Sequence, residues 1–300
     1  MRILITGATG FFGSHIVPTI YKNYFSKDNI ALLIRNQKRA IELFGELQNI
    51  QYFDLLNTNY KEQIKDFKPD LVVHLASYLT SQDDEENINK ILDVNIEMGT
   101  HLLDALKGTG IKYFINVGTC AEYYYNDGEL RSAYLYSATK TAFRAILRYY
   151  QQILNFQWIN VIPYTVYGEG DSQKKVIDYI ISSLDSKNKI PMTAGEQKLD
   201  FIHIEDVVDF FITLINKIEN IKQDFIELHL GTGKGTSIRE LAHVIETTYS
   251  RSTNIEWGAL PYRQNDIMQS VAHIAKNKEV LNWEAKIGLE KGIQKIKKDC

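Results

Sequence analysis

Cysteine and proline are both scarce in this sequence of 300 residues. Its two cysteines, Cys120 and Cys300, are too few for a disulfide framework and lack the spacing of metal ligands. No cluster of histidine and carboxylate has such spacing either, so we expect no metal. Only 5 prolines are present and there is no low-complexity linker, which favours a well-ordered chain. The low cysteine content fits a reducing cytoplasm, where we place the protein.

Long apolar runs and an excess of positive charge are absent as well. No apolar run approaches the length of a membrane span, and the first residues are typical of a strand rather than of a signal peptide. We therefore expect no membrane as a partner. The formal net charge of -3 gives no electrostatic reason to propose nucleic acid. The composition, 44% hydrophobic and 24% charged, indicates a globular protein with one large domain or one domain with a lobe.

What the sequence does contain is a regular alternation of short apolar runs and helical patterns. The apolar runs, rich in β-branched residues, predict buried strands at Arg2–Thr6, Ile30–Ile34, Asn49–Asp54, Leu71–Leu75, Tyr113–Val117 and Trp158–Ile162. Helical spacing lies between them at His15–Tyr24, Arg39–Leu47, Asn87–Lys107 and Ser137–Leu154. This alternation predicts an α/β fold with a Rossmann-type, doubly wound parallel sheet.

The regular alternation of predicted strands and helices ends after Gly168, and this change suggests that the chain divides into two parts. Residues 1–168 are expected to form the dinucleotide-binding domain, and residues 169–300 mainly a smaller substrate-binding lobe, with some segments returning to the sheet. The clearest elements beyond Gly168 are helices at Val176–Asp185 and Ser237–Ser250 and a strand at Ile226–Leu230. We expect the lobe to lie over the carboxyl ends of the strands, where ligands bind in such sheets.

The glycine-rich segment after the first predicted strand carries the most information. Gly7, Gly10 and Gly13 lie between an apolar run and a helical pattern. This order of strand, turn and helix places backbone N–H groups and a helix N-terminus against a pyrophosphate. By itself the spacing Gly-x-x-Gly-x-x-Gly also fits a structural turn, but its position at the end of a strand favours dinucleotide binding.

The residues after the second predicted strand bear on the choice of nicotinamide cofactor. An acidic residue is usual there in enzymes that use NAD, whereas this chain has Arg35, Asn36 and, slightly further, Arg39. Cations suit a 2′-phosphate, so we expect NADP(H) to be preferred, with NAD(H) still possible. The alternative is a solvated turn that opens a helix. After the third strand, Asp54 and Leu55 are placed at the adenine.

A tyrosine and a lysine four residues apart form the candidate catalytic pair. Tyr136 and Lys140 share one face of a predicted helix, and a nearby ammonium lowers the pKa of a phenol. Thr119 follows the strand Tyr113–Val117, where its hydroxyl can orient a substrate carbonyl. Tyr-x-x-x-Lys alone is a common pattern. Together with Thr119 and the glycine turn, it predicts proton transfer coupled to hydride transfer.

Ordered motifs along nearly the whole chain resemble those of one family. They are TGATGFFG at Thr6–Gly13, PDLVVHLAS at Pro69–Ser77, YSATK at Tyr136–Lys140, VYGEG at Val166–Gly170, DFIHIEDVV at Asp200–Val208, LGTGKGTSIREL at Leu230–Leu241 and PYRQND at Pro261–Asp266. In these the chain is similar to the extended short-chain dehydrogenases/reductases of the sugar-nucleotide epimerase/dehydratase family.

The resemblance implies further site residues. It makes Thr119, Tyr136 and Lys140 catalytic, and it makes Asn95 a residue that stabilises the active-site helix. The other implied cofactor contacts are Thr9, Phe11, Phe12, Leu75, Ala76, Ser77, Val117, Pro163 and Val166. The implied substrate contacts are Tyr78, Cys120, Ala121, Thr165 and Arg263, with Arg263 gripping a diphosphate. A homodimer through the helices Asn87–Lys107 and Ser137–Leu154 is also implied.

Two departures from the family narrow the reaction. Sugar-nucleotide 4,6-dehydratases have Asp and Glu directly after the catalytic Thr, where this chain has Cys120 and Ala121. Without these proton carriers we expect no dehydration, and we interpret Cys120 as a packed small residue. The sequence therefore predicts NADPH-dependent reduction of the C4 ketone of a nucleotide-diphosphate 4-keto-6-deoxysugar. The product would be a deoxyhexose donor such as CDP-abequose or dTDP-fucose, used in surface polysaccharide. The alternatives are a C4 epimerase with tightly bound NAD and, less favoured, a non-catalytic NADP(H)-sensing protein.

Overall fold

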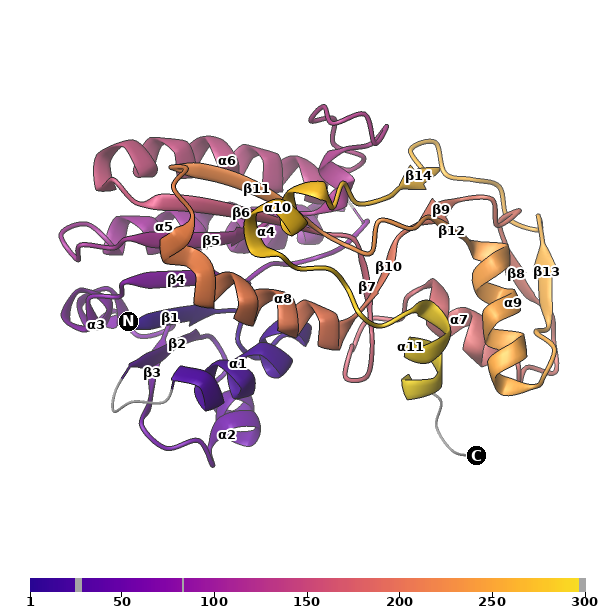
Figure 1. The fold of residues 1–300 in the computed structure, drawn as a ribbon, viewed down its shortest axis with the longest axis horizontal. Helices are drawn as coiled ribbons and strands as arrows, with labels where there is room; N and C mark the ends of the chain where they lie inside the picture. Colours follow the sequence, from indigo (N-terminus) through magenta and orange to yellow (C-terminus); the bar gives the residue numbers. More distant parts are fainter. Residues whose placement is uncertain (25–28, 83, 297–300) are drawn as a thin grey trace.

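The computed structural model describes residues 1–24, 29–82 and 84–296. Its centre is a parallel sheet of seven strands (Figure 1). In spatial order these are β11 (Phe225–Leu230), β6 (Gln157–Pro163), β5 (Tyr113–Val117), β4 (Leu71–His74), β1 (Ile3–Thr6), β2 (Ile30–Ile34) and β3 (Ile50–Asp54). The order reverses direction beside β1, so the sheet is doubly wound. The predicted Rossmann-type α/β fold is confirmed.

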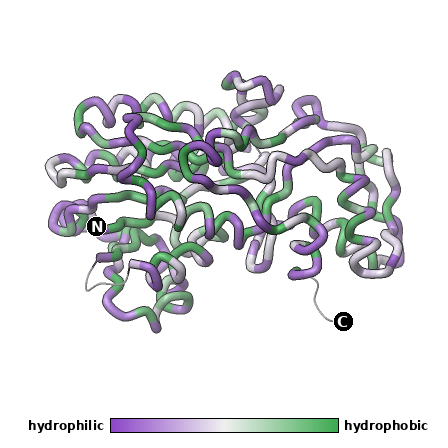
Figure 2. Tube along the Cα trace, in the orientation of Figure 1, coloured by the Kyte–Doolittle hydropathy of each residue, from purple (hydrophilic) through white to green (hydrophobic). Residues whose placement is uncertain are grey.

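Helices cover both faces of this sheet and bury its strands. One face packs against α1 (Phe11–Tyr24), α2 (Gln37–Phe44) and α8 (Ile204–Lys217). The other face packs against α3 (Tyr60–Phe67), α5 (Met98–Ala105) and α6 (Leu135–Leu154). Figure 2 shows hydrophobic residues along the sheet strands, as expected where both faces of a parallel sheet are covered. Within the described ranges, no helix is both long and apolar enough to cross a membrane.

Most predicted elements agree with the structure to within a few residues, and the exceptions have local causes. The long helix predicted at Asn87–Lys107 consists of α4 (Glu85–Leu92), a π-helical turn at Asp93–Glu97 and α5. The helix predicted to begin at His15 begins at Phe11, and that predicted at Arg39–Leu47 is α2. Short α3 was missed because only Ile64 and Phe67 are buried along it. Amphipathic α8 was not recognised as a helix either.

A smaller C-terminal lobe lies beyond the carboxyl ends of the strands, as expected (Figure 1). Its helices are α7 (Val176–Ser183), α9 (Ile238–Tyr249) and α11 (Leu289–Ile296), which share a separate apolar core. Its short strands are β7 (Thr165–Tyr167), β8 (Ile190–Met192), β9 (Lys198–Leu199), β10 (Phe201–His203), β12 (Thr236–Ser237), β13 (Ile255–Trp257) and β14 (Gln269–Ser270). Helix α10 (Ala275–Leu281) leads back to the main sheet, where it lies beside β11 and α8.

The buried carboxylate of Asp200 joins three segments at the border between sheet and lobe. Its oxygens accept hydrogen bonds from the backbone N–H groups of Thr232 (2.8 Å), Gly233 (2.8 Å) and Ala272 (3.1 Å). The Thr232 hydroxyl donates a further bond of 2.6 Å. Several donors are needed to compensate a carboxylate with no exposed surface. The loop after β11 and the segment after β14 are thereby held together.

Candidate active site

A cavity of about 460 Å³ opens at the carboxyl ends of β1, β2 and β4. The turn between β1 and α1 forms one wall, where the N-terminus of α1 supplies free backbone N–H groups. Gly7 has a φ of +66°, and a Cβ there would lie 2.5 Å from the backbone nitrogen of Ala76. A Cβ at Gly13 would lie 2.3 Å from the carbonyl oxygen of Ala8. The turn thus needs glycine at both positions, and its shape fits a dinucleotide pyrophosphate.

Eight of the residues expected to bind cofactor line this cavity: Gly7, Thr9, Gly10, Arg35, Leu55, Leu75, Ala76 and Ser77. Others are near but have different contacts. Asn36 caps α2 by accepting from the Arg39 N–H at 2.9 Å, and Arg39 itself is exposed and pairs with Glu42 at 3.5 Å. Asp54 accepts from the Leu56 N–H at 2.9 Å. The expected residues that do not line the cavity are Phe11, Phe12, Gly13, Asn36, Arg39, Asp54, Asn95, Val117, Tyr136, Lys140, Pro163 and Val166.

The far wall of the first cavity was not foreseen from the sequence. It is formed by Tyr60 at the start of α3 and by residues of the π-helical turn and α5, namely Asp93, Val94, Glu97, Met98 and His101. These residues belong to no recognisable motif. Only the packing of α5 on the sheet brings them opposite the glycine turn.

The three candidate catalytic residues come from two neighbouring elements. Thr119 follows β5 and caps the short helix Cys120–Glu122, where its hydroxyl accepts from the Ala121 N–H at 3.3 Å. Tyr136 and Lys140 lie on the first turns of α6, and both are buried. The Lys140 ammonium donates to the carbonyl oxygen of Val117 at 2.9 Å, which ties α6 to the end of β5.

Burial changes the protonation of this pair. It raises the pKa of the Tyr136 phenol, and a hydrogen bond with Ser77 acts in the opposite direction. The expected lowering of this pKa by Lys140 is therefore wrong for this arrangement of side chains. Burial also lowers the pKa of Lys140 to about 8, although the charge of Glu122 acts to raise it. Tyr136 is thus held as a neutral proton donor at neutral pH.

Asn95 connects the first cavity to the catalytic helix. The π-helical turn places its side chain inward, where Oδ1 accepts from the Tyr78 N–H at 2.8 Å and from the Ser77 hydroxyl at 3.3 Å. Its Nδ2 donates to the Thr139 hydroxyl of α6 at 3.1 Å. The side chain therefore contacts the helix that it was expected to stabilise.

A second cavity, of about 640 Å³, lies between the sheet and the lobe. Of the residues expected to contact substrate, Cys120, Thr165 and Arg263 line it, whereas Tyr78 lines the first cavity and Ala121 is buried. Burial raises the pKa of the Cys120 thiol, so it is not a thiolate at neutral pH. Further lining residues that the sequence did not reveal include Tyr134, Gln173, Thr193, Gln197, Gln264 and Ser270.

The candidate catalytic residues lie between these two cavities. Tyr136 is hydrogen-bonded to Ser77, which lines the first cavity, and Thr119 is hydrogen-bonded to Cys120, which lines the second. A ligand in each cavity would therefore meet at a phenol, a hydroxyl and an ammonium. Such a set can move a proton to or from an oxygen while hydride moves between the two ligands.

Comparisons with known proteins show the family and the fold of the chain. The model of a family described as "NAD dependent epimerase/dehydratase family" matches residues 3–227. CDP-abequose synthase of Salmonella typhimurium is 28% identical, over 99% of this chain and 97% of its own length. The corresponding protein of Yersinia pseudotuberculosis is 26% identical, over 89% and 91%. UDP-glucuronic acid 4-epimerase of Bacillus cereus, solved with UDP-glucuronic acid and NAD, has a similar fold, with a TM-score of 0.85, 21% identity and coverage of 99% and 98%.

Proposed function

The chain belongs to the NAD dependent epimerase/dehydratase family, and from this premise we propose that it reduces the C4 ketone of a nucleotide-diphosphate 4-keto-6-deoxysugar with NADPH. It is an enzyme of nucleotide-sugar metabolism in this proposal, with residues 1–168 as the cofactor-binding domain and residues 169–300 mainly as the substrate lobe. The CDP-abequose synthases that align with nearly its whole length support a deoxyhexose donor as the product.

The observation that carries the proposal is the lack of a free acid beside Thr119. Cys120 and Ala121 carry no carboxylate, and the next residue, Glu122, is fully buried and bonded to Arg144, Thr141 and the Thr119 N–H. Elimination of water from a sugar needs an additional acid–base pair at the substrate, which these residues do not supply. Reduction of a ketone needs only a hydride and one proton, and Tyr136 can supply the proton.

The proposed chemistry assigns one task to each catalytic side chain. NADPH held at the glycine turn would supply the hydride for C4, with the electron pair of the C=O bond moving onto the oxygen. Tyr136 donates its phenolic proton to that oxygen, so the products are the alcohol and the phenolate. The positive charge of the Lys140 ammonium stabilises the negative charge of the phenolate. The Thr119 hydroxyl orients the carbonyl by donating a hydrogen bond to it.

The lining of the second cavity supports a neutral deoxysugar beside a diphosphate. Around the catalytic residues the lining side chains are small or uncharged, such as Cys120, Ala133 and Thr165. Arg263 lines the same cavity and is exposed, as a cation that binds diphosphate should be. The Asp266 carboxylate, which also lines the cavity, accepts from the backbone N–H of Arg263 at 2.8 Å. In this proposal the sugar lies toward Thr119 and the nucleotide toward the Arg263 guanidinium.

To test this function, the purified protein is mixed with NADPH or NADH and with CDP-, dTDP- and GDP-linked 4-keto-6-deoxysugars, while NADPH absorbance is followed. We expect stoichiometric loss of NADPH with one of these sugars. If none is reduced and NAD copurifies with the protein, the C4 epimerase replaces the reductase. We include the search for copurified NAD because the chain is also similar to UDP-glucose 4-epimerases. Binding of NADPH without turnover of any sugar would favour the sensing protein.

The preference for NADPH is the part of the proposal that rests on Arg35. This cation follows β2 and lines the first cavity, where the adenosine ribose would lie. We expect Arg35→Ser to raise the Kd for NADPH about 10-fold with little effect on NADH, because the lost cation binds the 2′-phosphate. Arg39→Ser should have a smaller effect. Lys189→Ser, which removes the same charge in the lobe, is the control. Equal losses for both cofactors would contradict the preference.

The remaining parts of the proposal concern the setting of the enzyme. We infer a homodimer through α4, α5 and α6, where Leu92, Tyr149 and Ile153 are exposed apolar side chains. We further infer a cytoplasmic enzyme whose product is used for surface polysaccharide. Sedimentation of the protein measures the first of these directly.

A further inference from the structure

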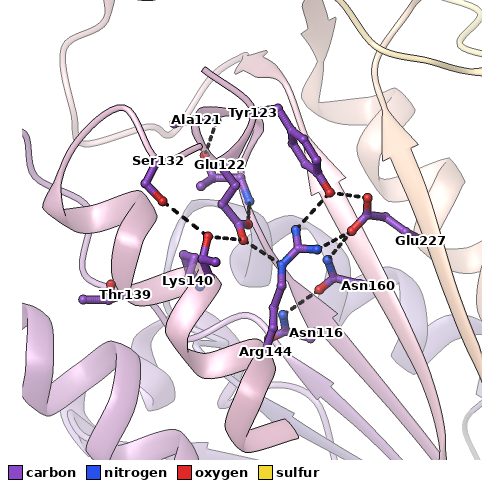
Figure 3. Close-up of polar contacts among 12 residues, drawn as sticks. Asn116, Ala121, Glu122, Tyr123, Ser132, Thr139, Lys140, Arg144, Asn160 and Glu227 are labelled. Carbon is purple, nitrogen blue, oxygen red and sulfur yellow. Dashed lines mark hydrogen bonds and ion pairs between the residues drawn. The ribbon is translucent and has the colours of Figure 1, made fainter. Parts of the chain in front are cut away.

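Glu122 is a fully buried carboxylate directly behind the candidate catalytic threonine. Its Oε1 accepts from the backbone N–H of Thr119 at 2.9 Å. Its Oε2 accepts from the Thr141 hydroxyl at 3.1 Å and from Arg144 Nε at 2.7 Å. Thr141 and Arg144 lie on α6, one and four residues beyond Lys140. One carboxylate therefore joins the turn of Thr119 to the helix of Tyr136 and Lys140 (Figure 3).

Arg144 extends this contact to the edge of the sheet. Its Nη1 donates to Glu227 Oε2 on β11 at 2.6 Å, and its Nη2 donates to the Tyr123 hydroxyl at 3.3 Å. Glu227 also accepts from Asn160 of β6 at 2.9 Å and from the Tyr123 hydroxyl. Figure 3 shows the guanidinium between the two carboxylates. Turn, helix and two strands are thus joined by one buried network.

The network packs closely against the Thr119 turn. The residue before it, Gly118, has no room for a side chain, since a Cβ there would lie 2.6 Å from Glu122 Oε1. A buried carboxylate that accepts from a guanidinium, a hydroxyl and a backbone N–H is held more firmly than a neutral acceptor would be. The carboxylate therefore determines where the threonine hydroxyl lies relative to Tyr136.

We propose that Glu122, held by Arg144, is a positioning residue for the reduction: it fixes Thr119 against the Tyr136–Lys140 pair and places its negative charge behind that pair. This inference rests on the proposed ketoreductase function. Glu122 touches neither cavity, so its effect on the reaction passes through Thr119, Tyr136 and Lys140.

The charge of Glu122 acts on both members of the pair in the same direction. It acts to raise the pKa of Lys140, which burial lowers. It also acts to raise the pKa of Tyr136, which burial raises as well. Tyr134 and Cys120 also act to raise the pKa of Tyr136, and the charge of Lys140 acts to lower the pKa of His74. Arg144 and Glu227 face Glu122 from the other side. Burial acts to raise the pKa of Glu227, but the hydrogen bond from His229 and the charge of Arg144 lower it to about 2. Glu227 thus stays ionised, while Glu122 favours the protonated Tyr136 that reduction requires.

The test compares Glu122→Gln, Arg144→Met and the double variant with the wild type. We expect Glu122→Gln to lower kcat about 10²-fold with KM and the Kd for NADPH nearly unchanged, as for misplaced catalytic groups. Activity of the wild type should be lost at high pH, when Tyr136 or Lys140 loses its proton. Because the amide in Glu122→Gln carries no charge, the pKa values of Tyr136 and Lys140 should both fall in this variant. The high-pH limb of the curve of activity against pH should therefore move to lower pH.

The double variant separates positioning from stability. Arg144→Met leaves both Glu122 and Glu227 without their guanidinium partner and should lower Tm strongly. In Glu122→Gln/Arg144→Met one of these two charges is gone, so Tm should recover in part while kcat stays low. Arg251→Met, which removes an ion pair with Asp185 in the lobe, is the control and should keep full kcat. Recovery of kcat together with Tm, or an unmoved pH limb in Glu122→Gln, would overturn the proposal.

Hydrogen exchange of the segment 118–123 keeps this test independent of the function. If the wild type reduces no keto sugar, the ketoreductase fails, yet the turn can still be measured. Faster exchange of this segment in Glu122→Gln, with the rest of the sheet unchanged, supports positioning of Thr119. Unchanged exchange refutes it.

Discussion

Replacing Tyr136 by phenylalanine should lower kcat for ketone reduction about 10³-fold, within the range found for loss of a general acid. The ring fills its buried position in either case, and only the hydroxyl bonded to Ser77 is lost. The developing alkoxide then loses the proton donor that we propose for it. The Kd for NADPH should change by less than about twofold, since we propose that the pyrophosphate binds at the glycine turn.

The measurement is steady-state reduction together with NADPH binding by fluorescence. Tyr150→Phe, the same substitution further along the same helix, where the ring packs in the apolar core between helices and sheet, is the matched control and should keep wild-type kcat. Full activity in Tyr136→Phe would mean that the proton comes from another group. The assignment of the catalytic set would then be wrong.

Adding one methyl group at Gly13 should destabilise the protein by about 3 kcal/mol, at the upper end of typical overpacking costs. The new Cβ would lie 2.3 Å from the Ala8 carbonyl oxygen and 2.5 Å from its carbon, and both are backbone atoms that cannot turn away. Helix α1 must then move from the turn that it closes. We expect cofactor affinity to fall with stability, because the helix N-terminus moves with it.

Two further glycines make this prediction specific. At Gly10 the nearest atom to a Cβ is the Gly7 carbonyl oxygen at 3.3 Å, so Gly10→Ala should spare stability and lower only cofactor affinity, since the methyl group occupies the approach of the phosphates. At Gly288 nothing lies within 4 Å, and Gly288→Ala should affect neither quantity. Urea unfolding and NADPH titration of the three variants measure both. A Gly13→Ala protein as stable as Gly288→Ala would contradict the close packing of α1 on the turn.

Local patterns were sufficient to predict the sheet, and the catalytic set that we propose rests on local patterns as well. The strands of the main sheet are continuous apolar runs bounded by polar residues, so their positions could be predicted to within about two residues. The glycine turn and Tyr136–Lys140 are local motifs whose chemistry depends on residues a few positions apart. Patterns of this kind can be recognised in a sequence without knowledge of the residues that pack against them.

The rest of the site depends on contacts between distant segments. The second cavity joins residues near 80, 134, 193 and 264, which no spacing in the sequence brings together. Glu122 was overlooked because a glutamate in a polar stretch is normally exposed, and only its contact with Arg144 shows otherwise. The direction of the Tyr136 pKa was mistaken for the same reason, since the cost of burial cannot be estimated before the neighbours are known.

The position of β11 has a consequence for the order in which the chain can become folded during synthesis. The strand at Phe225–Leu230 closes the β6 edge of the sheet, and α8 covers one of its faces, yet both follow the first segments of the lobe. A nascent chain that ends near residue 168 lacks β11 and α8, so part of one apolar face of its sheet has no cover, and exposed apolar surface of this kind favours aggregation. Residues 1–168 therefore do not contain all the segments that complete the main sheet.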